Sequence, residues 1–105
     1  MSYDPIILRR WPEILPTLDE LSLEARHGVL DGMGGDRIDI FRAGETDPDQ
    51  TLGTVRFVEG GWYRGKAIDE EGEVHRGPLH RTILEAFEDV IEEIRTKNDM
   101  GEVRA

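Results

Sequence analysis

Two histidines are the residues best suited to acid–base or metal chemistry in this chain. His75 and His80 are five residues apart, with Arg76 and Arg81 beside them. Imidazole is both a common general acid–base group and a common metal ligand, so the pair could converge on a metal or a substrate. However, no carboxylate has an obvious position as a third ligand, and the neighbouring arginines repel a cation. We therefore expect no metal site, no catalytic residues, no cofactor and no enzymatic activity.

Positive side chains gather between positions 54 and 81 of a chain that is acidic overall. They are Arg56, Arg64, Lys66, Arg76, His80 and Arg81. Because a helix is expected to begin near position 78, and helix N-termini attract anions, these residues form a candidate anion-binding site. The alternative is that they pair with Glu59, Glu70, Glu71 and Glu73 of the same predicted sheet.

Negative side chains line the outer face of the last predicted helix. They are Glu85, Glu88, Asp89, Glu92 and Glu93. A dense row of carboxylates can bind a basic protein, as in DNA mimics, or can simply be a solvated helix face. Trp62 and Tyr63 are a second candidate contact, because adjacent strand residues point to opposite faces and an exposed aromatic ring is a common interface anchor.

Composition limits the classes of function. The 105 residues contain 23 Asp and Glu against 13 Lys and Arg, a net charge of −10, and no cysteine. The missing thiols exclude disulfides and Cys-ligated zinc, and the negative charge disfavours direct nucleic-acid binding. The sequence begins without a basic and apolar leader pattern and has no apolar run long enough to span a membrane. We expect one small acidic, soluble, cytoplasmic domain.

The apolar spacing places these side chains on a small set of elements. Steps of three and four residues from Trp11 to Val29 predict a helix over 12–30, and similar steps from Leu79 predict a second helix over 78–97. Residues 1–10 and 98–105 are expected to fray.

Strand patterns lie between the two predicted helices. Alternation predicts a strand over 37–43, and two strands over 52–59 and 62–68 flank the hairpin signal Gly60-Gly61. A two-residue loop would place Val58 opposite Tyr63, and residues 73–76 form a short return strand. The expected fold is an α+β two-layer sandwich, with a three- or four-stranded antiparallel sheet and a C-terminal helix packed on it.

Two functional hypotheses follow from these patterns. The first is a non-enzymatic protein-binding domain, an acidic inhibitor, antitoxin or immunity-type partner of a basic protein, that uses the acidic helix and the Trp62-Tyr63 pair. The alternative is a small-anion or nucleotide-binding regulatory module that uses the basic residues. Edge strands and an exposed aromatic ring also permit a homodimer.

Overall fold

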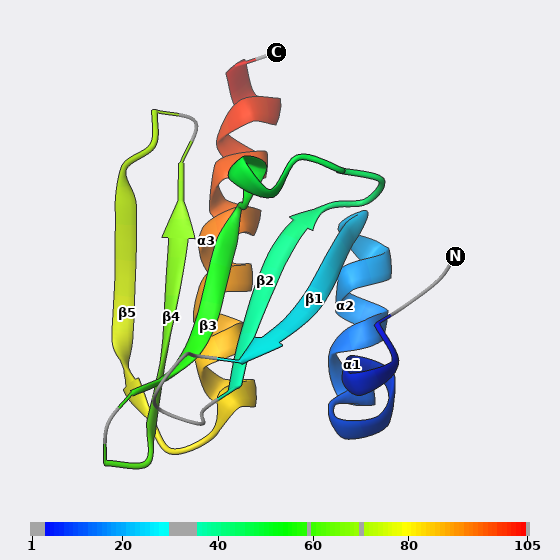
Figure 1. Ribbon diagram of the computed structural model, residues 1–105. Helices are drawn as coiled ribbons and strands as arrows, with labels where there is room; N and C mark the ends of the chain where they lie inside the picture. The colour runs from blue at the N-terminus through cyan, green and yellow to red at the C-terminus, as the bar shows by residue number, and fades with distance from the viewer. Residues whose placement is uncertain (1–3, 30–35, 59, 70, 105) are drawn as a thin grey trace.

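The fold is an α+β sandwich in which helices cover one face of a five-stranded antiparallel sheet (Figure 1). The computed structural model describes residues 4–29, 36–58, 60–69 and 71–104. The N-terminal elements are α1 (Pro5–Arg10), the 3-10 turn η1 (Pro12–Ile14) and α2 (Leu15–Glu20). They are followed by β1 (Leu23–Val29), β2 (Asp36–Arg42), the 3-10 turn η2 (Pro48–Gln50), β3 (Gly53–Val58), β4 (Trp62–Ile68), β5 (Val74–His80) and α3 (Ile83–Arg104).

The sheet is a simple meander with strand order β1-β2-β3-β4-β5. The long helix α3 packs on β3, β4 and β5, and the short N-terminal helices pack on β1. The helices α1, α2 and α3 lie on one side of the sheet, and no α-helix of the described residues covers the other side (Figure 1). No helix in these ranges is both long and apolar enough to cross a membrane. We call the helix-free side the open face.

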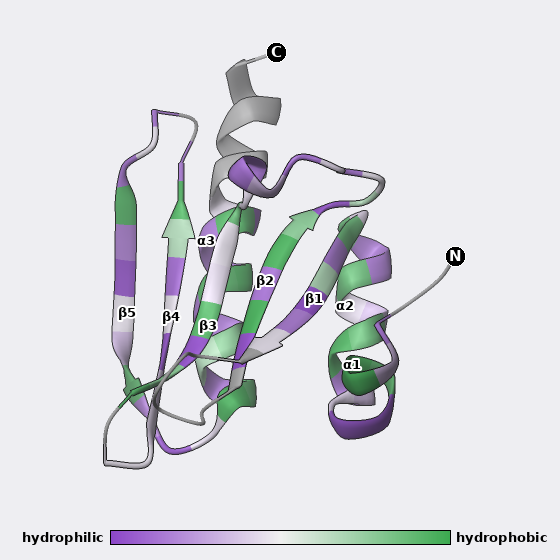
Figure 2. Cartoon of the chain, viewed as in Figure 1, coloured by the Kyte–Doolittle hydropathy of each residue, from purple (hydrophilic) through white to green (hydrophobic). Residues whose placement is uncertain are grey.

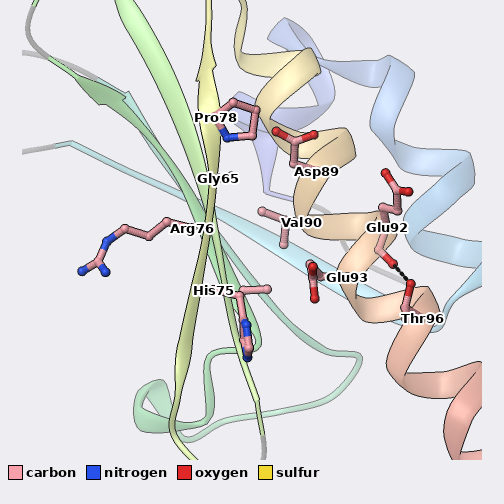
Figure 3. Close-up of a pocket in the computed structure, with 11 residues that line it drawn as sticks. Gly65, His75, Arg76, Pro78, Asp89, Val90, Glu92, Glu93 and Thr96 are labelled. Carbon is pink, nitrogen blue, oxygen red and sulfur yellow. Dashed lines mark hydrogen bonds between the residues drawn. The ribbon is translucent and has the colours of Figure 1, made fainter.

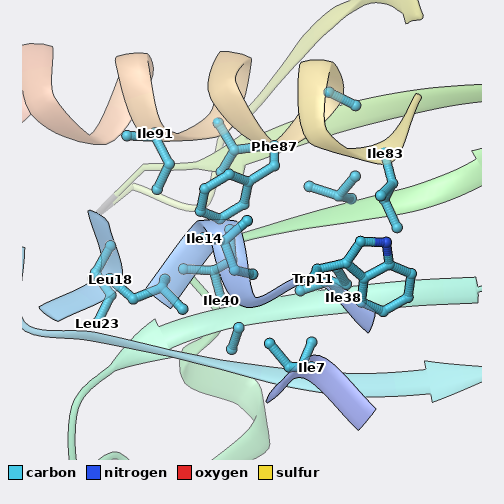
Figure 4. Close-up of a cluster of buried hydrophobic side chains, with 14 of the residues drawn as sticks. Ile7, Trp11, Ile14, Leu18, Leu23, Ile38, Ile40, Ile83, Phe87 and Ile91 are labelled. Carbon is cyan, nitrogen blue, oxygen red and sulfur yellow. The ribbon is translucent and has the colours of Figure 1, made fainter. Parts of the chain in front are cut away.

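One apolar cluster fills the space between the helices and the sheet (Figure 4). Phe87 and Ile91 of α3 meet side chains from both other layers, such as Ile14 of η1 and Ile40 of β2. These four residues are at most 2% exposed, and no polar or charged side chain among the described residues is buried with them. Burial of apolar area therefore holds the two layers together. Colouring by hydropathy separates apolar segments from strongly polar ones along the same strands (Figure 2).

The N-terminal third differs from the predicted helix over 12–30. Helix ends at Glu20 in α2, and residues 23–29 form strand β1. The misleading signal is the spacing of Leu21, Ala25 and Val29, because steps of four fit a helix of period 3.6 and also the two-residue period of a strand. His27, inside the range predicted as helix, lies on β1 with its ring centre 5.8 Å from that of Trp11.

Residues 4–10, where fraying was expected, form a capped helix, whereas residues 1–3 lie outside the described residues. Asp4 caps α1 by accepting a hydrogen bond from Ile6 N at 2.9 Å, and Pro5 occupies the first turn. Ile7 is only 1% exposed, because it packs in the apolar cluster. The backbone N–H of His27 also donates to Asp4 Oδ2, which joins this end of the chain to β1.

The C-terminal boundary differs as well, because Gly77 and Pro78 lie inside β5 and do not end it. Proline is tolerated there since β5 is an edge strand. The helix begins at Ile83, five residues later than predicted, and continues to Arg104 where a frayed tail was expected. Thr82 and Glu85 mark this start, because Glu85 N donates to Thr82 Oγ1 and Thr82 Oγ1 donates to Glu85 Oε1.

The β3–β4 hairpin is confirmed, but its register differs by one residue from the prediction. Val58 pairs with Trp62 and not with Tyr63, so three residues separate the paired positions. Gly60 and Gly61 have positive φ angles of 92° and 84°, as the turn requires. A shift of one residue changes which side chains are neighbours across the strands, and here it places Arg56 directly opposite Arg64.

Candidate functional site

The open face of the sheet carries a group of four positive side chains. Arg56 of β3 pairs with Arg64 of β4, and Lys66 of β4 pairs with Arg76 of β5. Because side chains alternate along a strand, all four point away from the face where Val55, Gly65 and Ala67 meet the helices. Figure 3 shows Arg76 projecting away from α3, on the far side of the strand from the helix. We call Arg56, Arg64, Lys66 and Arg76 the open-face cations.

The four charges are close enough to repel one another. Burial of the Lys66 ammonium, and then the charges of Arg56, Arg76 and Arg64, lower the pKa of Lys66 below its ordinary value of 10.5. None of the four forms an ion pair within the ranges that the structure describes. Gathering them is therefore an electrostatic cost that no described carboxylate offsets.

The two expected glutamate partners that the structure describes do not neutralise this group. Glu71 and Glu73 form no ion pair with the open-face cations, while Glu59 and Glu70 lie outside the described residues. Arg64 Nε is enclosed by protein and has no hydrogen-bond acceptor among the described atoms. A buried N–H without an acceptor costs about 1–3 kcal/mol, so this atom adds to the cost of placing Arg64 among the other cations.

The neighbouring half of the open face is neutralised internally. Arg37, which pairs with Arg56 across β2 and β3, lies 3.1 Å from Asp39 Oδ2. Arg26 of β1 lies 4.0 Å from the ring centre of Phe41 and 3.4 Å from Glu24 Oε2. Within the described ranges, the positive charge of the open face that has no ion pair thus lies on β3, β4 and β5. The sequence could not place Arg37 beside the site, because its strand partner is set by a fold-level pairing.

Trp62 extends the open face beyond the cations. It lies two residues before Arg64 on β4, on the same side of the sheet and about 7 Å away along the strand. The guanidinium of Arg81 lies over its ring, 3.8 Å from the ring centre. Tyr63 points to the helix side, where it packs on the core and against Phe57. The two aromatic residues therefore do not form one contact surface.

His80 is not part of this site, although the sequence grouped it with the cations. Its Nε2 lies 2.7 Å from Asp89 Oδ2 and its Nδ1 lies 3.5 Å from Glu85 Oε2, on the helix side of β5. His75 has a different partner, Asp69, at 3.1 Å. The two histidines are about 16 Å apart along an extended strand. They therefore do not converge on one metal or substrate.

The turn between β4 and β5 brings together groups that could coordinate a metal ion. Asp69, Glu73 and His75 each have a ligand atom within 4.8 Å of the others. Asp69 Oδ1 already accepts hydrogen bonds from the backbone N–H groups of Glu71 and Glu73. Because these bonds organise the turn, the grouping has a structural explanation.

The acidic helix face is divided by the fold. Glu85 belongs to the start of α3 and Asp89 bonds to His80, whereas Glu88, Glu92 and Glu93 are exposed and have no ion pair among the described residues. A groove with a volume of about 350 Å³ runs between β5 and α3 (Figure 3). Asp89, Glu92 and Glu93 line its helix side, so that side of the groove is negative, whereas its strand side includes His75 and Arg76.

The chain matches no protein-family model, no curated protein and no solved structure. A function for the chain must therefore follow from the chemistry of the two surfaces described above.

Proposed function

We propose that this protein is an anion-binding module whose open face binds a ligand with several phosphate groups. Four cations on three adjacent strands, with no ion pair among the described residues, carry this proposal. Their mutual repulsion opposes folding, and like charges gathered on one surface are typical of a site for the opposite charge. A bound anion would offset the repulsion and would supply oxygen acceptors for the guanidinium groups.

The layout of the open-face cations favours several phosphates over one. The group spans β3, β4 and β5, which corresponds to about 10 Å across the strands. One phosphate can contact part of such a group, whereas a row of linked phosphates can neutralise all of it. Arginine also suits phosphate oxygens, because its planar group donates two parallel hydrogen bonds.

Cytoplasmic location and the absence of enzymatic activity stay predictions.

Inorganic polyphosphate is the simplest probe of this function. We expect it to bind the wild-type protein at low ionic strength, with an affinity that falls as salt is added. Replacing Arg56→Gln and Arg76→Gln together removes two exposed charges and should weaken binding at least about tenfold. Isothermal titration calorimetry over a series of salt concentrations measures both effects.

A matched double variant distinguishes the effect of the proposed site on binding from the effect of net charge. Arg9→Gln with Arg42→Gln also removes two exposed positive charges, but neither residue belongs to the open-face cations. We expect this control to bind polyphosphate within about twofold of wild type. Equal weakening by both double variants, or no binding by the wild-type protein, would contradict the proposed site.

A second candidate function is docking of a basic protein on the acidic side of α3, as for an inhibitor, antitoxin or immunity-type partner. The observation that favours it is the groove beside Glu92 and Glu93, which can accept a lysine or arginine side chain. Replacing Glu88, Glu92 and Glu93 with glutamine should abolish capture of a basic protein in a nuclease-treated pull-down. Unchanged capture would exclude this face as the contact.

A further inference from the structure

We infer that the polyanion bound by the open face is a single-stranded nucleic acid. The inference rests on the proposed function and adds the contribution of Trp62 and Arg81. A ligand that consists only of phosphate groups would not use the ring surface of Trp62 and Arg81. A nucleic-acid strand alternates phosphates with planar bases, so it can use the cations and the ring surface together.

The stacked pair provides a planar surface next to the cations. The Arg81 guanidinium covers the Trp62 ring at 3.8 Å, and Trp62 pairs with Val58 across the hairpin. Bases stack on tryptophan rings and on guanidinium planes alike. Because Trp62 and Arg64 are two residues apart on one side of β4, a base on this surface would leave its backbone phosphates near the open-face cations.

The shape of the face favours a single strand over a duplex. Duplex bases are read by an element that enters a groove, usually a helix or a two-stranded ribbon. Here the cations lie on the face of three adjacent strands, β3, β4 and β5, of a five-stranded sheet (Figure 1), and a sheet of this width cannot enter a groove. A single strand can lie across such a surface with its bases accessible for stacking.

The net charge of −10 does not prevent this contact, because the exposed carboxylates of α3 lie on the other side of the sheet from the open-face cations. Glu88, Glu92 and Glu93 belong to α3, on the side of the sheet away from the open-face cations. At physiological ionic strength the Debye length is about 8 Å, so charges behind the sheet are largely screened from a ligand in front of it. The sequence-based expectation against nucleic-acid binding used only the total charge. The total charge does not show that the α3 carboxylates and the open-face cations lie on opposite sides of the sheet.

The test compares oligothymidylate with inorganic polyphosphate at equal phosphate concentration. Trp62→Ala should weaken oligothymidylate binding by roughly 5- to 100-fold and change polyphosphate binding less than about twofold. Trp62→Phe, which keeps a ring, should recover part of the loss. Thermal unfolding of each variant checks that it is folded. Tryptophan fluorescence is a second readout, since Trp11 is 8% exposed and quenching by oligothymidylate should disappear in Trp62→Ala.

Four other results are possible, and each would contradict a different claim. If Trp62→Ala binds oligothymidylate as wild type does, base stacking is wrong while the anion-binding function stands. If a thymidine–adenine duplex binds as tightly as the single strand, the preference for single strands is wrong. If polyglutamate binds and oligothymidylate does not, the occupant is an acidic protein. If no polyanion binds, the proposed function itself is wrong.

Discussion

Phe87→Ala is expected to lower the free energy of unfolding by about 3–5 kcal/mol, because it leaves a cavity at the centre of the apolar cluster. Phe87 is 2% exposed and is among the largest fully buried side chains. It lies where α3 meets both the sheet and the N-terminal turn η1 (Figure 4). Urea unfolding followed by circular dichroism measures the loss as a lower midpoint at an unchanged slope.

Phe57→Ala is the matched control for this change. Phe57 is half-buried and contacts Tyr63 edge to face with ring centres 5.7 Å apart. Its removal should cost only about 1–2 kcal/mol, because less apolar area returns to water. Equal losses in the two variants would contradict the assignment of Phe87 to the centre of the core.

Much of the sheet could be predicted from the sequence, because strong local signals agreed there. Alternating side chains and the Gly60-Gly61 turn identified β3 and β4 within one residue. Local signals failed where two periods coincide, as in β1, and where a turn residue lies on an edge strand, as Pro78 does in β5. Both errors depend on tertiary context. A strand at the edge of a sheet, such as β5, can contain a proline that would end a central strand.

The candidate site was predictable as a set of residue types but not as a surface. The charge pattern identified Arg56, Arg64, Lys66 and Arg76, and the structure brings these four together. It separates His80 from them, because the longer β5 places that ring on the helix side beside Asp89. The face on which each cation lies depends on the lengths of the loops and strands. A register shift of one residue changes which cations are neighbours.

Gly65 connects the core to the site, because it lies on β4 between Arg64 and Lys66 and faces the opposite side. A Cβ atom built there would lie 2.5 Å from the carbonyl oxygen of Ala86 and 2.6 Å from Val90 Cγ2. The first of these atoms is backbone within α3 and cannot rotate away. The missing side chain at Gly65 therefore lets α3 lie close to the sheet directly behind the two cations.

Gly65→Ala is consequently expected to lower the free energy of unfolding by about 2–3 kcal/mol, since overpacking must displace the helix. The melting temperature should fall by roughly 10 °C or more. Gly28→Ala is the control, because a Cβ there meets only the flexible end of Arg37, at 2.9 Å, and should cost far less. Thermal unfolding of both variants measures this difference. Equal melting temperatures would mean that α3 does not need to pack closely on Gly65. If Gly65→Ala also retains polyphosphate binding while folded, the cations act from the strands alone and not through the position of the helix.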